Sequence, residues 1–159
     1  MSDWPAIAIE DDLALPPGLD EVFVVRVLEA AQASGGRRLR LSVLLCGDRT
    51  MGELHARFLD DPSPTDVLSF PLEPEGEHEA DGELVVDVDE ARRLAEEHGN
   101  AWLAEVALYL VHGVLHLSGC DDHEPEDLAE MKRREADAMR ALSLQVAGRH
   151  GPDADDDAR

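Results

Sequence analysis

The sequence has few cysteines, little lysine and no long uninterrupted apolar run. Its two cysteines, Cys46 and Cys120, are too few for a disulfide framework and are typical of a protein in a reducing cytosol. The first residues, MSDWPAIAIEDD, contain acidic side chains and no basic region, unlike a secretory signal peptide. Glu105 and two histidines interrupt the apolar stretch 101–118, whereas a membrane-spanning helix needs about 20 apolar residues. We therefore expect a cytoplasmic protein with no membrane partner.

Basic residues are scarce as well. The chain has 14 of them against 36 acidic residues, a formal net charge of −22, and Lys132 is the only lysine. The tail after His150 has four aspartates and one arginine, so it contributes only −3. A domain that binds DNA or RNA unaided should have a basic surface, and we expect no DNA partner. The one local exception, GGRRLRL, contains Arg37, Arg38 and Arg40, which could contact phosphates or could be a solvated entry to a strand.

The periodicity of apolar residues predicts an α+β domain. Strand patterns occur at residues 4–10, 38–46, 65–73 and 82–88. Helical patterns occur at residues 16–36, 51–59, 89–99, 101–118 and 125–142. This order predicts a small mixed β-sheet of about four strands covered by helices, with a histidine-bearing helix buried at the centre. The expected single domain is residues 1–147, followed by an acidic disordered tail at 148–159.

Individual residues give finer expectations. Asp20 or the turn before it can start the first long helix, and Thr50 is expected to cap the second. Pro71 cannot donate to a β-ladder, so it fits an edge position or the end of a strand. Glu135 interrupts the apolar face of the last helix and is expected as a carboxylate at the rim of the core.

Two histidines in the segment VALYLVHGVLHLSGCDDHE are the most informative feature of the sequence. His112 and His116 are four residues apart, so on a helix their imidazoles lie one turn apart on the same face. Gly119 can end that helix, and the chain can then fold back with Asp122 and His123 in reach. Imidazole and carboxylate are zinc ligands, and catalytic zinc sites use three protein ligands plus water. The pattern favours a metal-dependent hydrolase; the alternative is a pair of core histidines bonded to carbonyls and waters.

Three segments resemble those of the bacterial YbeY family, which comprises rRNA maturation factors described as zinc-dependent endoribonucleases. HGVLHLSG and the acidic turn behind it resemble the family pattern H-G-x-L-H-L-x-G-x-D-H. PTDVLSFP at 64–71 resembles the other characteristic segment of the family, and GELVVDVDEARRLAEEHG resembles the strand and helix between them. The resemblance runs from residue 20 to residue 142.

The resemblance implies one Zn²⁺ per chain and a single-strand-specific endoribonuclease. Its expected roles are rRNA processing, at the 3′ end of 16S rRNA, and ribosome quality control. The expected partners are rRNA in the small ribosomal subunit and ribosome-associated proteins. By the same resemblance Ser69 lies on a strand that lines the cleft. The arginines of the basic segment, Arg37, Arg38 and Arg40, are the candidate phosphate contacts.

The resemblance also implies roles for the residues around the metal. His112 and His116 are expected both to bind the ion and to be catalytic. The third histidine of the family follows the second by six residues; Asp122 occupies this position here, and His123 comes one residue later. Either Asp122 or His123 is therefore the expected third ligand. Asp121, or whichever of those two does not bind the ion, is expected to orient a histidine or to move protons.

The residues at two single positions bear on two rival functions. The first of these positions is also a second departure from the family pattern. The family often has an arginine, thought to matter for activity, in the helix before TDVLSFP, and Leu59 stands there in this chain. This absence favours a non-enzymatic ribosome-assembly factor with a structural zinc. A zinc peptidase of the H-E-x-x-H type would need a glutamate as general base after the first histidine, and Gly113 stands there instead.

Overall fold

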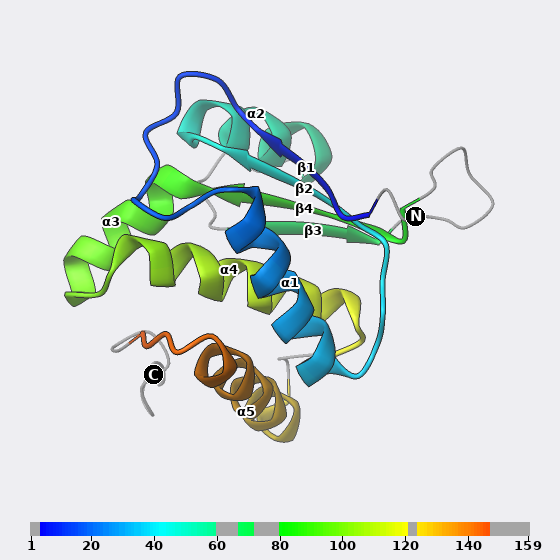
Figure 1. Ribbon diagram of the computed structural model, residues 1–159. Helices are drawn as coiled ribbons and strands as arrows, with labels where there is room; N and C mark the ends of the chain where they lie inside the picture. Colours follow the sequence, from blue (N-terminus) through cyan, green and yellow to red (C-terminus); the bar gives the residue numbers. More distant parts are fainter. Residues whose placement is uncertain (1–3, 60–66, 72–79, 121–123, 147–159) are drawn as a thin grey trace.

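The computed structural model describes residues 4–59, 67–71, 80–120 and 124–146, and for residues 58–59 and 67–71 it describes the backbone only. The elements follow the order predicted from the sequence (Figure 1). The strands are β1 (Ala6–Ile9), β2 (Leu41–Cys46), β3 (Val67–Pro71) and β4 (Gly82–Asp87). The helices are α1 (Glu21–Gly35), α2 (Asp48–Leu59), α3 (Val88–His98), α4 (Trp102–Leu117) and α5 (Pro125–Ala141).

The four strands form one mixed sheet in the order β1-β2-β4-β3. Strands β1, β2 and β4 run parallel, and β3 is antiparallel to β4. This confirms the predicted α+β class with a small mixed sheet. Pro71 ends the edge strand β3 opposite Gly82, so its predicted edge position is confirmed as well. At an edge the missing N–H of proline removes no bond from the middle of the sheet.

Side chains alternate along β2 and β4 and give the sheet two apolar faces. One face joins the main core under α1 and α4, through Val43, Leu45, Leu84 and Val86. The opposite face packs against α2, through Cys46, Val85 and Met51. Figure 1 shows α2 on one side of the sheet and α1 and α4 on the other. The sheet is therefore covered by helices, as predicted, and the structure shows that they cover both of its faces.

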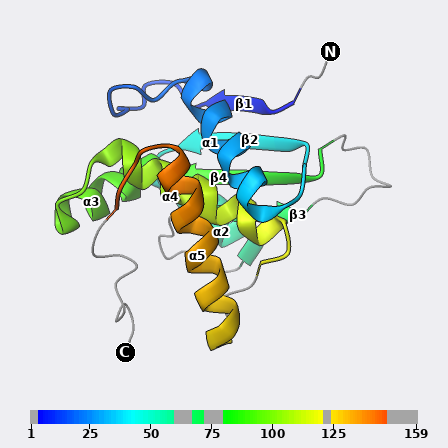
Figure 2. The same cartoon turned by 60° about the horizontal axis from the view of Figure 1, so that its bottom comes forward.

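Helix α4 lies at the centre of the domain. Residues 104–111 and 113–115 of this helix are buried, and it packs against β3, β4, α1, α3 and α5. Figures 1 and 2 both show α5 on the side of α4 that faces away from the sheet. The prediction of a central, buried helix that carries the histidines is thus confirmed. Across the described ranges, no helix is both long enough and apolar enough to cross a membrane.

Capping residues set where the helices begin. Asp20 is the N-cap of α1, as predicted, and its carboxylate accepts a hydrogen bond from the Phe23 N–H (2.9 Å). The prediction that Thr50 caps α2 is wrong. This helix begins at Asp48, and the Met51 N–H already donates to the Gly47 carbonyl (3.0 Å). An acidic side chain in this first turn suits the positive end of the helix dipole.

Candidate metal centre

The C-terminal half of α4 carries both histidines predicted as metal ligands. The rings of His112 and His116 have centroids 4.6 Å apart and planes at 80° to one another. Both residues are half-buried, and 28% of the His112 side chain is exposed. The structure therefore brings the two imidazoles together on one helix, as their spacing predicted, and leaves both of them partly exposed to solvent.

Glu135 of α5 contacts the first of these imidazoles. His112 Nδ1 lies 2.5 Å from Glu135 Oε2, and the glutamate side chain is only 4% exposed. An ionised carboxylate accepts hydrogen bonds and cannot donate them, so this partner assigns the imidazole proton to Nδ1. A metal ion would then bind His112 through Nε2. Histidine ligands in metalloproteins commonly have such a carboxylate behind them.

The rim position expected for Glu135 is wrong, because the residue is buried. It lies on the face of α5 that also buries Met131, Ala138 and Met139. A carboxylate is costly to bury unless it is paired and hydrogen-bonded. An acidic residue at an apolar position of an amphipathic helix was thus the sequence signal for a buried partner. The sequence did not reveal that this partner is His112.

Two further contacts hold α5 in place against α1. The Arg134 guanidinium donates to the Ser34 carbonyl (2.6 Å), and the Ser34 hydroxyl donates to the Arg134 carbonyl (2.7 Å). Arg134 also forms an ion pair with Glu130, one turn earlier (2.7 Å). Because Arg134 directly precedes Glu135, these bonds fix the position along α5 at which the carboxylate meets His112.

Gly119 ends the histidine helix, as predicted. Its φ of +104° is a conformation that residues with a Cβ rarely adopt. The Cys120 N–H donates back to the Leu115 carbonyl (2.9 Å) and closes the turn. The three residues predicted to supply the third ligand and the proton carrier lie outside the described residues: Asp121, Asp122 and His123. Their roles stay predictions.

The arginine-containing loop lies at the same end of the sheet as the end of the histidine helix. Leu117, next to His116, packs so closely on Gly82 that a Cβ at Gly82 would lie 2.8 Å from Leu117 Cδ1. Gly82 is the first residue of β4, and Asp81 before it pairs with Arg40 just before β2. The topology therefore brings the arginines and the histidines, far apart in sequence, to one end of the domain.

Arg40 forms an ion pair and a backbone hydrogen bond with Asp81. Its guanidinium lies 3.1 Å from Asp81 Oδ1, and its backbone N–H donates to Oδ2 of the same side chain (2.8 Å). These hydrogen bonds lower the pKa of Asp81. Arg37 and Arg38, earlier in the loop, are exposed. Contact of the three arginines with a substrate stays a prediction.

The backbone shows where two other residues from the sequence analysis lie, Ser69 and Leu59. Ser69 lies on β3 opposite Leu84 of β4, and α4 packs against β3. The strand is therefore a neighbour of the histidine helix; contact of the Ser69 side chain with substrate stays a prediction. Leu59, at the position where the family often has an arginine, is the last residue of α2.

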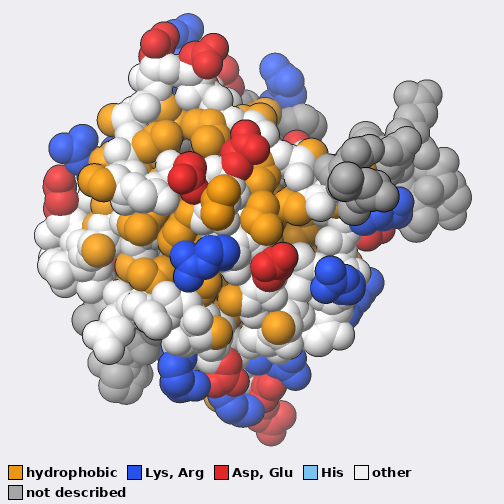
Figure 3. Space-filling view, in the orientation of Figure 1, with side chains coloured by type: hydrophobic (Ala, Val, Ile, Leu, Met, Phe, Trp, Pro, Cys, Tyr) orange, Lys and Arg blue, Asp and Glu red, His pale blue; other side chains and the backbone are white. Residues whose placement is uncertain are grey.

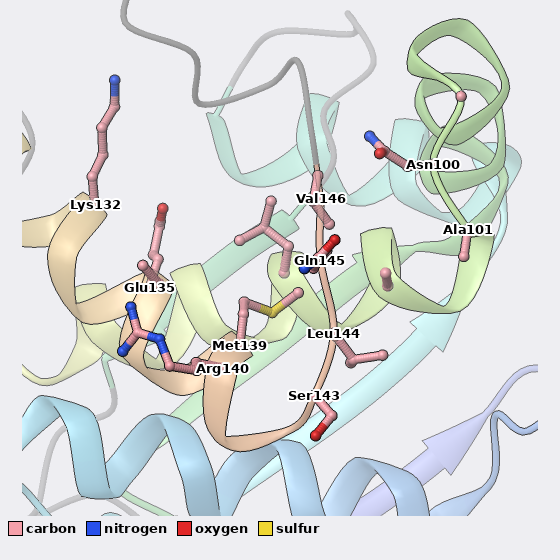
Figure 4. Close-up of a pocket in the computed structure, with 14 residues that line it drawn as sticks. Asn100, Ala101, Lys132, Glu135, Met139, Arg140, Ser143, Leu144, Gln145 and Val146 are labelled. Atoms are coloured by element: carbon pink, nitrogen blue, oxygen red, sulfur yellow. The ribbon is translucent and has the colours of Figure 1, made fainter.

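A cavity of about 1010 Å³ adjoins this site, between α4, α5 and the segment that follows α5. Glu135 belongs to its wall, and Lys132 and Arg140 bring positive charge to it (Figure 4). Neither His112 nor His116 lines the cavity. Since Glu135 contacts the Nδ1 side of His112, the cavity lies behind the pair of residues and not where a metal ion would bind to Nε2.

The fold is similar to a solved structure. The solution structure of TM1509 from Thermotoga maritima matches with a TM-score of 0.57 over 86% of this chain and 91% of that chain. The two sequences are 23% identical, so this likeness concerns the fold. Fold and histidines together define a small α+β domain with a candidate metal centre on its central helix.

Several relatives share more of the sequence. An Endoribonuclease YbeY from Anaeromyxobacter sp. (strain Fw109-5) is 42% identical over 113 residues, which cover 70% of this chain and 59% of that protein. Those of Carboxydothermus hydrogenoformans and Rhodopirellula baltica are each 36% identical, covering 69% and 86% of this chain and 77% and 73% of those proteins. The family model Endoribonuclease YbeY matches residues 19–143. The chain therefore belongs to the Endoribonuclease YbeY family, hydrolases that act on RNA, and the resemblance noted in the sequence is confirmed.

Proposed function

We propose that this protein is a metal-dependent endoribonuclease that hydrolyses phosphodiester bonds in single-stranded RNA. The observation that carries the proposal is the contact between His112 Nδ1 and Glu135, one turn before a second imidazole. A buried carboxylate that orients a half-exposed histidine suits a metal ligand better than a histidine that only fills the core. Membership of a family named for endoribonucleases supports RNA as the substrate.

One Zn²⁺ per chain would be held by His112, His116 and a third ligand, Asp122 or His123. The donor set fits, because two imidazoles and one further oxygen or nitrogen ligand are common in catalytic zinc sites. Glu135 supplies the outer partner that such histidines usually have. The partial exposure of the histidines leaves room for water and substrate.

Zn²⁺ and the side chains of the protein would make different contributions to hydrolysis. When bound, Zn²⁺ supplies a Lewis acid that polarises a phosphoryl oxygen and lowers the pKa of a water molecule. Glu135 keeps the proton of His112 on Nδ1 and so keeps the lone pair of Nε2 directed at the ion. Asp121, or whichever of Asp122 and His123 does not bind the ion, takes the proton of the attacking water and returns it to the leaving oxygen.

The proposed substrate in the cell is rRNA, near the 3′ end of 16S rRNA, with a further role in ribosome quality control in the cytoplasm. Arg37, Arg38, Arg40 and Ser69 are the proposed RNA contacts. The net charge of −22 opposes tight binding of free RNA, so we place the reaction on the small subunit or with a ribosome-associated protein. On the face seen in Figure 3, basic side chains are separated by acidic and apolar ones. Tight binding of bare rRNA by the isolated protein, in a filter assay at low salt, would contradict this placement.

A second candidate function is a ribosome-assembly factor whose zinc is structural. The observation in its favour is Leu59 at the end of α2, where the family often has an arginine. Such a protein would bind RNA or protein through the same surface without cutting it. Its metal would be needed for the fold and not for a reaction.

The test is cleavage of single-stranded RNA by three proteins: wild type, His116→Ala, and His98→Ala, which removes an imidazole from the end of α3. Zinc content and circular dichroism are measured on the same samples. We expect His116→Ala to lose bound zinc and cleavage while keeping its fold, and His98→Ala to keep all three. Zinc-loaded wild type that leaves RNA intact refutes the enzyme. Unfolding of both His116→Ala and chelator-treated wild type favours the structural zinc.

A further inference from the structure

Acidic side chains gather where the three parallel strands end. Asp48 opens α2 just after β2, Asp87 ends β4, and Asp89 lies in the first turn of α3. One oxygen from each of these side chains lies within 4.8 Å of the other two. Glu10, just after β1, accepts a hydrogen bond from the Gly47 N–H beside them (3.3 Å). The carboxyl ends of parallel strands are the edge at which open α/β sheets bind ligands.

This edge is remote from the histidines. Leu117, at the end of α4, packs on Gly82, the first residue of β4. Asp87 is the last residue of the same strand. The acidic cluster and the candidate zinc centre therefore lie at opposite ends of β4, and no ligand is shared between them.

The Asp87 side chain is the second observation that points to a ligand. It is fully buried (0% exposed), and its Oδ1 accepts hydrogen bonds from the N–H groups of Asp89 (2.9 Å) and Glu90 (3.2 Å). Its other oxygen, Oδ2, is buried and has no hydrogen-bond partner within the described part of the chain. An oxygen of the Asp48 carboxyl lies within 4.8 Å of an oxygen of Asp87. Two carboxylates repel one another unless a proton or a cation lies between them.

The positive groups at this edge are engaged with other oxygens. Arg93 donates to both oxygens of Asp48 (2.7 and 2.8 Å) and pairs with Glu90. The Asp48 N–H donates to Asp89 Oδ2 (3.0 Å). Neither Arg93 nor the Asp48 N–H therefore supplies a counter-charge or a hydrogen bond to Asp87 Oδ2.

We propose that Asp48, Asp87 and Asp89 bind a divalent cation that prefers oxygen ligands, with Ca²⁺ as the candidate ion. Ca²⁺ accepts several carboxylate oxygens in flexible geometry, so it suits three oxygens that lie within 4.8 Å of one another. Mg²⁺ requires near-ideal octahedral geometry and usually binds only one or two carboxylates. Asp48 is exposed, so the ion reaches the buried Asp87 oxygen from solvent.

The competing occupant of this space is a proton. Burial, and then the neighbouring Asp48 carboxyl, raise the pKa of Asp87 to about 8 in the absence of any ion. The Cys46 thiol beside the cluster stays neutral, because burial and the surrounding carboxylates raise its pKa to about 12. A bound cation would replace the proton of Asp87 and would hold the first turns of α2 and α3 together, so it would stabilise the folded chain.

Trp102 provides a local probe for this site. Its indole N–H donates to the Val88 carbonyl (2.8 Å), and Val88 stands between Asp87 and Asp89 in the chain. The other tryptophan, Trp4, precedes β1 at the opposite end of that strand. Tb³⁺ substitutes for Ca²⁺ at oxygen sites and emits when a neighbouring tryptophan is excited. The experiment titrates Tb³⁺ into the full-length protein and then displaces it with Ca²⁺.

We expect tryptophan-sensitised emission that saturates at one ion per chain and is removed by Ca²⁺. Trp102→Phe should abolish the emission and Trp4→Phe should leave it. Asp87→Asn should weaken binding at least about tenfold because it removes a charged ligand, while asparagine still caps α3. Asp89→Asn should act in the same direction, and Asp127→Asn, an exposed acid of α5, should have no effect. His116→Ala should also leave the emission, which separates this site from the zinc centre.

Three results would overturn the proposal. The first is absence of sensitised emission. The second is emission that does not depend on Trp102, which would place the ion elsewhere, for instance on the acidic tail. The third is unchanged affinity in both Asp87→Asn and Asp89→Asn. Any of them would leave the proton as the occupant of Asp87.

Discussion

Glu135 Oε2 lies 2.5 Å from His112 Nδ1, although the two residues are 23 positions apart and belong to different helices. The glutamate is enclosed by the core, whereas the histidine is partly open to solvent. The packing of α5 on α4 therefore orients the imidazole, and no loop is needed for this. A site held by two packed helices keeps its geometry better than one held by loops.

We predict that Glu135→Gln lowers the affinity of the histidine site for Zn²⁺ by about 10–100-fold. Glutamine has the shape of glutamate but no charge, so it stabilises the Nδ1–H of a ligating imidazole less well. Competition with a chromophoric chelator measures the affinity, and circular dichroism checks the fold. The matched control is Asp137→Asn, which removes an exposed acid from the same helix. Equal affinities of wild type and Glu135→Gln would show that Glu135 does not tune the site.

We predict that replacing glycine by alanine has opposite effects on the free energy of unfolding at two positions. Gly119 ends α4 with φ +104°, so Gly119→Ala should lower the free energy of unfolding by about 1–2 kcal/mol. Gly52 lies inside α2, and among the described residues no atom beyond its chain neighbours and its own helix backbone lies within 4 Å of an added Cβ. Gly52→Ala should therefore raise the free energy of unfolding by about 0.5–1 kcal/mol. Urea denaturation of both variants beside wild type measures the two changes. Changes of the same sign would contradict this account of the turn after His116.

The order of helices and strands could be predicted because an element that is buried on one side repeats its apolar residues at a characteristic spacing. The stretch 101–118 is mostly apolar, and this predicted the central, buried helix that the structure shows as α4. The start of α2 was misplaced, because Thr50 is a good capping residue in isolation while backbone bonding from Gly47 begins the helix earlier. Local preference alone does not show which of several polar residues caps a helix.

Contacts between distant elements could not be predicted from local patterns. The contact of Glu135 with His112 depends on how α5 crosses α4, which no periodicity encodes. The acidic cluster depends on strand register: Cys46 of β2 pairs with Asp87 of β4, and only this register brings Asp48 and Asp89 together. The two histidines could be placed from the sequence because both candidate ligands lie on one helix. Contacts that depend on the packing of two or more elements could not.

The ion pair between Arg40 and Asp81 predicts a dependence of stability on pH. Hydrogen bonds from Arg40 lower the pKa of Asp81 in the folded protein. A carboxyl with a lowered pKa stabilises the fold above its unfolded pKa, and the effect is lost as the pH falls through the folded pKa. The side chains of Arg40 and Asp81 are 53% and 37% exposed, so solvent screening keeps the contribution below about 1 kcal/mol.

We therefore predict that Arg40→Gln lowers the free energy of unfolding slightly at neutral pH and that this difference disappears in acid, once Asp81 is protonated. Urea denaturation of wild type and Arg40→Gln, at neutral pH and in acid, measures this difference in the free energy of unfolding. Arg49→Gln is the matched control, because its pair with Glu53 is longer (3.7 Å) and more exposed (93% and 65%). Arg49→Gln should change stability less than Arg40→Gln at neutral pH. A deficit in Arg40→Gln that grows as the pH falls would have the wrong sign for this ion pair and would contradict the prediction.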